Sequence, residues 1–65
     1  MQPEDLVRVS QFCEANPAFK VSAIRWLIHN SHDNGLADAK VIVRIGRSVY
    51  IDKIRFAEWL EGQAA

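Results

Sequence analysis

A strand–turn–strand pattern between Val41 and Ile51 constrains the fold of this chain more than any other feature. β-branched residues stand on both sides of Gly46-Arg47-Ser48, as expected of a β-hairpin. With 65 residues, the chain is short enough for one small domain, predicted over 1–65 with frayed ends at 1–5 and 63–65. Such a chain buries only about 60% of its unfolded surface. Cys13 is its only cysteine, so no internal disulfide reinforces this marginal core.

The length of the hairpin loop decides which side chains share a face. A three-residue loop at 46–48 places four apolar side chains on one face, namely Val43, Ile45, Val49 and Ile51. Arg44 and Tyr50 then share the other face. A two-residue loop at 46–47 instead sets Arg44 opposite Val49 and mixes the faces. Because burial of one face selects the unmixed register, we predict the three-residue loop.

Two helices are expected before the hairpin. Ser10 is the predicted N-cap of a helix over 11–15, which points Phe12 inward and ends at Asn16-Pro17. After a connector with Phe19 packed beneath it, Ser22 is the predicted N-cap of a helix over 23–30. The buried stripe of this second helix follows the helical repeat and consists of Ile24, Leu27 and Ile28.

A loop and a third helix complete the pattern. The segment 31–35 is rich in turn residues and is predicted to be a turn that opens a loop to Lys40. Asp52 is the expected cap of a helix over 53–61, which Gly62 ends. The inward stripe of this helix is predicted to be Phe56, Trp59 and Leu60. The order helix, turn, helix, hairpin, helix indicates an α+β fold of the winged helix-turn-helix type.

Charge is segregated along a chain whose net charge is zero. The stretch 15–51 carries five basic and two acidic residues, whereas the remainder carries three basic and six acidic ones. This distribution indicates a molecule with a basic face that suits an anionic partner.

Enzyme chemistry finds no support in the sequence. Cys13, His29 and His32 are too few and wrongly spaced for a structural zinc site, and no nucleophile or phosphate-loop motif occurs. A domain of this size has little room for both a core and an enclosed pocket. We therefore expect no catalytic residues, no metal, no cofactor and no small-molecule substrate. An acidic start, a single cysteine and the lack of a long apolar run favour a cytoplasmic protein with no membrane partner.

Double-stranded DNA is the partner that the basic residues fit best. The free N–H groups after Ser22, at the start of the second helix, favour a phosphate there, with Lys20 just before them. Arg25 stands one turn further, where a guanidinium can grip guanine, and Trp26 is expected to pack rather than to read DNA. The predicted contacts are Lys20, Ser22, Ala23, Arg25 and His29 on the helix side, and Lys40, Arg44 and Arg47 on the hairpin side.

The segment Val41–Asp52, followed by Phe56 and Trp59-Leu60, resembles the C-terminal half of small excisionase-like, MerR-like winged-helix proteins. This family includes the AlpA-type regulators of prophages and integrative elements. The segments 16–19, 22–28 and 34–36 are similar to the turn, second helix and loop of such proteins.

The resemblance implies a DNA-binding protein whose second helix enters the major groove and whose hairpin is the wing. It further implies a recombination directionality factor or a transcriptional regulator. The positions that match the family's contacts are Ser22, Arg25, His29, Arg44 and Arg47. A second copy of the chain or an integrase is then a further partner.

A protein-interaction module that binds no DNA is the alternative. Exposure of Trp26 beside Leu36 would favour this second function, because it would create an apolar patch for a partner.

Overall fold

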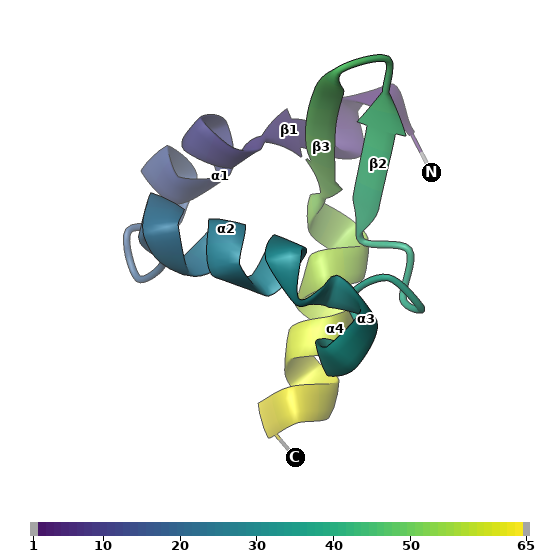
Figure 1. Ribbon diagram of the computed structural model, residues 1–65. Helices are drawn as coiled ribbons and strands as arrows, with labels where there is room; N and C mark the ends of the chain where they lie inside the picture. The colour runs from purple at the N-terminus through teal and green to yellow at the C-terminus, as the bar shows by residue number, and fades with distance from the viewer. Residues whose placement is uncertain (1, 65) are drawn as a thin grey trace.

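The computed structural model describes residues 2–64, which form a small α+β domain with four α-helices, one 3-10 helix and a three-stranded antiparallel sheet (Figure 1). The elements are, in order, η1 (Pro3–Asp5, the 3-10 helix), β1 (Leu6–Arg8), α1 (Val9–Ala15), α2 (Val21–His29), α3 (Ser31–Asn34), β2 (Ile42–Ile45), β3 (Ser48–Asp52) and α4 (Lys53–Ala64). The α+β class expected from the sequence is confirmed. The predicted frayed ends lie partly on residues 1 and 65, outside the described residues, but η1 occupies 3–5 and the end of α4 occupies 63–64.

β3 is the middle strand of the sheet, which has the order β1-β3-β2. β1 pairs with β3 through Leu6 opposite Asp52, Val7 opposite Ile51 and Arg8 opposite Tyr50. The sequence did not predict β1, because three residues are too few to show an alternating pattern.

The hairpin has a two-residue loop, so the predicted three-residue loop is wrong. Ile45 lies opposite Ser48 and Arg44 opposite Val49, which leaves Gly46 and Arg47 as the loop. Gly46 has φ 59°, and glycine in the first position of a two-residue loop matches the twist of the strands. Burial of a whole face does not select the register here, because only the base of the hairpin meets the core. Ile51 is fully buried, whereas Ile45 near the tip is 56% exposed.

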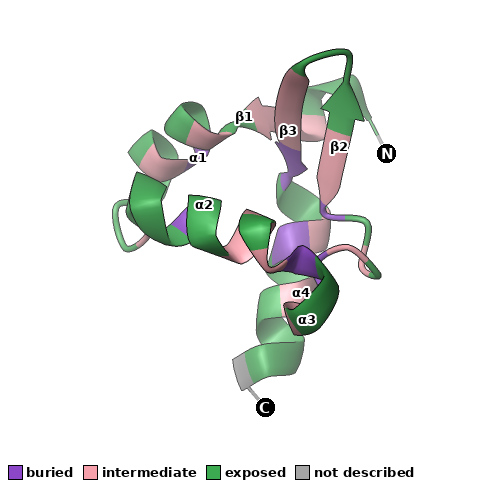
Figure 2. Cartoon of the chain, viewed as in Figure 1, coloured by how far each residue is buried: buried purple, intermediate pink, exposed green. Residues whose placement is uncertain are grey.

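The core lies between the sheet, α1, α2 and the first turns of α4 (Figure 2). Its buried side chains are Phe12, Ile24, Leu36, Val41, Ile51 and Phe56. Phe12, Phe19 and Phe56 form an aromatic cluster with ring centroids 4.8–5.9 Å apart and edge-on or tilted planes, the arrangement that aromatic quadrupoles favour. The predicted inward positions of Phe12 and Phe19 are therefore confirmed.

The predicted helix stripes are confirmed in α2 and mostly in α4. Ile24 is buried, and Leu27 and Ile28 pack against the core, as do Phe56 and Trp59 from α4. Leu60 is 37% exposed, so its predicted inward position is wrong.

Neither Ser10 nor Ser22 is an N-cap, because α1 and α2 each begin two residues earlier than predicted. The N-cap of α1 is Arg8, whose backbone N–H donates to Oε1 of Gln11 at 3.0 Å. The N-cap of α2 is Lys20, without a side-chain cap. Packing of Phe19 in the aromatic cluster fixes the chain just before this point, so α2 starts directly after the connector.

Asn34 joins three parts of the structure. The segment predicted as a turn over 31–35 is one helical turn, α3, which ends at Gly35 with φ 87°. The Asn34 Nδ2 group donates to the Leu27 carbonyl at 3.0 Å, and the Asn34 Oδ1 atom accepts from the Leu36 N–H at 3.0 Å. The Trp59 indole N–H donates to the Asn34 carbonyl at 2.9 Å. These bonds tie α2 and α4 to the loop that buries Leu36.

The predicted cap of the last helix is confirmed. Oδ1 of Asp52 accepts from the backbone N–H groups of Ile54 and Arg55, each at 3.1 Å, while its Oδ2 lies 3.4 Å from the Arg55 Nε. The predicted end of the helix at Gly62 is wrong, because α4 continues through Gly62 to Ala64.

We expect Asp52→Ala to lower the free energy of unfolding by about 1–2 kcal/mol, because two N–H groups lose their cap. Asp52→Asn keeps an acceptor oxygen and loses only the ion pair, so it should cost less. Urea unfolding followed by circular dichroism measures both. Asp38→Ala, on an exposed loop, is the control. A loss for Asp52→Ala no larger than that of the control would contradict the capping role.

Two glycine-to-alanine substitutions should change stability in opposite directions. Gly46→Ala forces a side chain into the left-handed region and should destabilise the fold by about 1 kcal/mol. A Cβ at either glycine meets no atom within 4 Å, so conformation alone decides the sign. Gly62→Ala replaces a helical glycine and should stabilise by about 0.5 kcal/mol. Thermal unfolding measures both variants. Stabilisation by Gly46→Ala, or destabilisation by Gly62→Ala, would contradict the loop conformation or the helical end described here.

Candidate nucleic-acid interface

One exposed side of α2 carries three of the predicted DNA contacts. With about 100° between successive helical residues, Ser22, Arg25 and His29 fall within about 60° of one another. All three are exposed. Ala23 lies about 160° from Arg25 around the axis, so the structure does not bring it to the same side. Lys20 is exposed at the N-cap of α2, next to this side.

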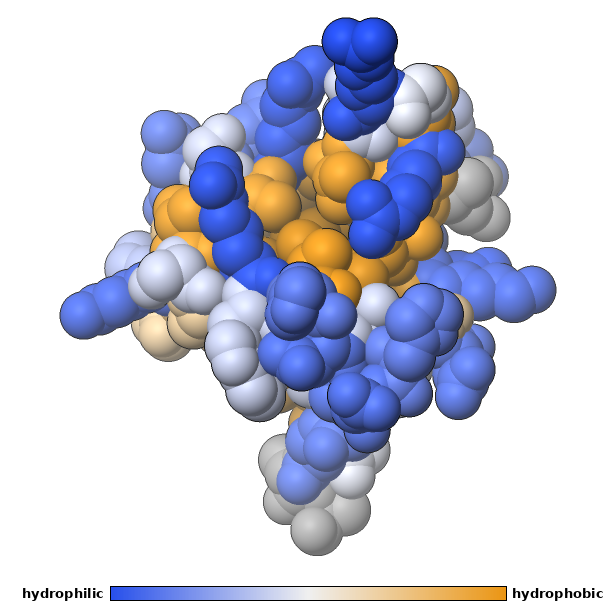
Figure 3. Space-filling model, viewed as in Figure 1, coloured by the Kyte–Doolittle hydropathy of each residue, from blue (hydrophilic) through white to orange (hydrophobic). Residues whose placement is uncertain are grey.

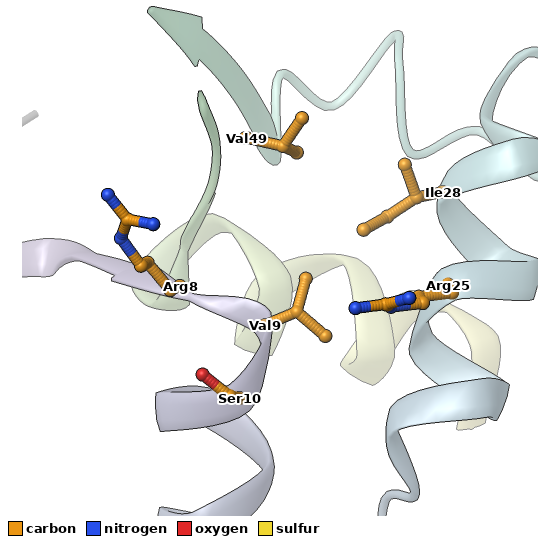
Figure 4. Close-up of a pocket in the computed structure, with 6 residues that line it drawn as sticks. All are labelled: Arg8, Val9, Ser10, Arg25, Ile28 and Val49. Carbon is orange, nitrogen blue, oxygen red and sulfur yellow. The ribbon is translucent and has the colours of Figure 1, made fainter. Parts of the chain in front are cut away.

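A hollow of about 360 Å³ separates this side of α2 from α1 and the hairpin. Its apolar walls come from three elements, with Val9 from α1, Ile28 from α2 and Val49 from β3 (Figure 4). The Arg25 side chain extends from α2 towards Val9 (Figure 4). Figure 3 shows the same apolar surface as a recess ringed by hydrophilic side chains. The recess therefore joins the exposed side of α2 to one face of the hairpin.

Arg44 belongs to this same face of the hairpin. Residues opposite each other in an antiparallel pair share a face, so Arg44 lies on the side of Val49, which lines the hollow with Arg25. A neighbouring hollow of about 290 Å³ is lined by Arg44 together with His32 of α3. The predicted placement of Arg44 beside Tyr50 is wrong, because the two-residue loop turns Arg44 towards the helices. Arg8 takes that place, with its guanidinium carbon 5.5 Å from the centre of the Tyr50 ring.

The remaining predicted cations flank the hairpin. Arg47 is exposed in the loop at its tip, and Lys40 is exposed at its base with φ 57°. Lys40, Arg44 and Arg55 line a third hollow of about 390 Å³. The sequence did not single out Arg55, because its helical spacing indicated only a water-facing position. Arg55 lies near Lys40 and Arg44 because of the direction in which α4 extends from the end of β3.

Few negative charges oppose these cations. The elements α2, β2 and the loop after β2 contain no acidic residue. Within residues 2–64 the one ion pair joins Arg55 to Asp52, so no carboxylate neutralises Arg25, Arg44 or Arg47. Their charge remains available to an anionic partner.

Trp26 does not pack, contrary to the prediction. It lies in the middle of α2 and is 62% exposed, whereas Leu36 is 1% exposed. The two residues therefore do not form the joint apolar patch that would favour a protein-interaction module.

Residues 2–64 hold neither a metal-binding cluster nor a helix that could span a membrane. No cluster of three or more His, Cys, Asp and Glu side chains that could hold a metal ion occurs in 2–64. Cys13 is a free thiol, half-buried against the core. In the same part of the chain, every helix is too short or too polar to cross a membrane.

Comparisons of this chain with protein-family models, with curated proteins and with solved structures gave no match. The function is inferred from the geometry and charge of the interface.

Proposed function

We propose that this protein binds double-stranded DNA as a winged helix-turn-helix domain. In this proposal α1, the connector and α2 form the helix-turn-helix, and the β2–β3 hairpin is the wing. The observation that carries the proposal is the placement of Arg25 and Arg44 on one side of the molecule, on either side of Val49. Two unpaired guanidinium groups on adjoining elements suit a DNA groove, with Arg25 towards the base edges and Arg44 towards the phosphates that border them.

The dimensions of α2 suit the major groove. A helix with its side chains is about 10–12 Å wide, and the groove of B-form DNA is about 12 Å wide. The side of α2 that carries Ser22, Arg25 and His29 would face the bases. With α2 in the groove, the hairpin lies beside it and reaches the neighbouring backbone.

Each cation has a role that its position supports. Arg25 extends from the middle of α2, where a guanidinium can donate two hydrogen bonds to guanine O6 and N7. Lys20 stands at the N-cap of α2 and suits a phosphate. Arg47 at the exposed tip of the wing suits a phosphate or the minor groove, and Arg44 and Lys40 suit the backbone along the wing. Ala23 has no role here, because it faces away from Arg25.

The biological role that we propose is that of an excisionase or a transcriptional regulator of a phage or integrative element. A single module of this size buries about 600–1,000 Å² on DNA and binds modestly alone. Cooperative binding of several copies, or binding beside an integrase, would supply the missing affinity. Both arrangements place the protein on DNA in the cytoplasm.

The protein-interaction module has weaker support. The apolar patch expected of it at Trp26 is absent, because Leu36, the neighbour that would extend the exposed ring, is buried. The two functions differ in salt dependence, since DNA binding by cations weakens as salt rises. Retention on heparin that disappears at high salt favours the DNA-binding function.

We expect the wild-type protein to shift a duplex selected from a random pool, with log K falling against log salt at a slope of about −4. Arg44→Ala and Arg47→Ala should each weaken binding and reduce the slope by about one, whereas Arg25→Ala should weaken binding and relax the preference for guanine at one position. Lys53→Ala, a cation that lines none of the hollows beside Arg25 and Arg44, is the matched control. Gel shifts over a salt series measure these quantities.

Thermal unfolding accompanies each variant. The three arginines are exposed, so their removal should change the free energy of unfolding by less than about 0.5 kcal/mol. If Arg25→Ala and Arg44→Ala are both folded and bind the duplex with unchanged affinity, the proposed function is wrong.

A further inference from the structure

Trp26 lies on the outward side of α2 and is 62% exposed. It lies about 160° around the helix from Ile24, which is buried in the core. The other tryptophan, Trp59, packs against Phe56 and donates its indole N–H to a carbonyl within the fold. Trp26 therefore contributes little to the core and exposes a large apolar ring to water, which is unfavourable in the free protein. A partner that covers this ring would remove that cost.

The surroundings of Trp26 decide between a protein and DNA as that partner. On its side of α2 the neighbouring exposed residues are Ser22, Ala23 and His29, with Arg25 about 100° around the helix axis. Apart from the methyl group of Ala23 they are hydrogen-bonding or cationic groups, and the nine residues of α2 include no carboxylate. With Leu36 buried, this methyl group adds too little apolar surface beside the ring for a protein partner to use. An apolar ring within a cationic, hydrogen-bonding surface fits a partner that is anionic and offers single apolar groups.

We propose that Trp26 reads a thymine by packing its indole ring against the C5-methyl group of that base in the major groove. The inference rests on the proposed function and adds a specificity-determining residue to it. Among the major-groove edges of the four bases, thymine alone presents a methyl group. The ring over any other base edge would deprive polar atoms of water without giving them a hydrogen bond. Trp26 thus favours thymine at one position of the target.

Replacement of thymine by deoxyuridine tests this contact, because it removes only the methyl group. The duplex is selected by wild-type protein from a random pool, and each thymine is replaced in turn. One replacement should weaken binding of the wild-type protein about fourfold, the value expected for one buried carbon group. Trp26→Ala should bind that duplex and its deoxyuridine form equally. Ile54→Ala removes an exposed apolar side chain of α4 and should keep the wild-type discrimination.

Fluorescence gives a second measurement on the same complex. Trp59→Phe leaves Trp26 as the only tryptophan of the chain. Its emission should shift to shorter wavelength or be quenched on addition of the selected duplex, because the ring leaves water. The deoxyuridine assay on the wild-type protein does not depend on this variant, so a folding defect in Trp59→Phe leaves the test intact.

The outcomes separate this inference from the proposed function. Salt-dependent duplex binding with equal affinity for every deoxyuridine form, or with discrimination that survives in Trp26→Ala, overturns the role of Trp26 and leaves DNA binding in place. Self-association that Trp26→Ala abolishes without affecting the thymine preference also overturns it. Absence of any duplex binding by the wild-type protein overturns both.

Discussion

Antiparallel pairing on both edges of β3 is the interaction on which the rest of this structure depends. Ile51 of this strand is paired on both edges, opposite Val7 of β1 and Ile42 of β2, and is completely buried. The strand ends at Asp52, whose carboxylate caps α4 directly. The middle strand therefore fixes both neighbouring strands and the origin of the last helix. A small domain without a disulfide gains its order from such shared contacts, because each one restricts several elements at once.

The register of the hairpin connects this framework to the proposed function. Because the hairpin loop has two residues, Arg44 of β2 lies opposite Val49 of β3. Its side chain is therefore on the side of the sheet that faces α2. A shift of one residue would have turned Arg44 to the opposite face, away from Arg25. The mixed faces near the tip carry little energetic cost because that end of the hairpin projects beyond the core. Solvent exposure thus leaves the tip free to present cations, while the base holds the fold.

The exposed surface of α2 shows a similar division of roles. Ile24 and its stripe anchor the helix, and the opposite side presents Ser22, Arg25, Trp26 and His29. Helical spacing from the sequence was enough to place Ile24 inward and Arg25 outward. The same spacing also turns Trp26 outward, but an apolar ring on a polar side was expected to find packing partners. In the fold the Trp26 ring has no such partners and is 62% exposed. This exposure is the basis for the proposed contact with DNA.

The sequence by itself determined the α+β class, the buried stripes of α2 and most of α4, the inward Phe12 and Phe19, and the Asp52 cap. These features follow from spacing and from hydrogen bonds between residues close in the chain. Only the tertiary structure decided the pairing of β1, the hairpin register and the starts of α1 and α2. It also decided that Arg44 and Arg55 line the same hollow. Those features depend on contacts between residues far apart in the chain. Local propensity does not specify such contacts, because they are set by packing between elements in the folded core.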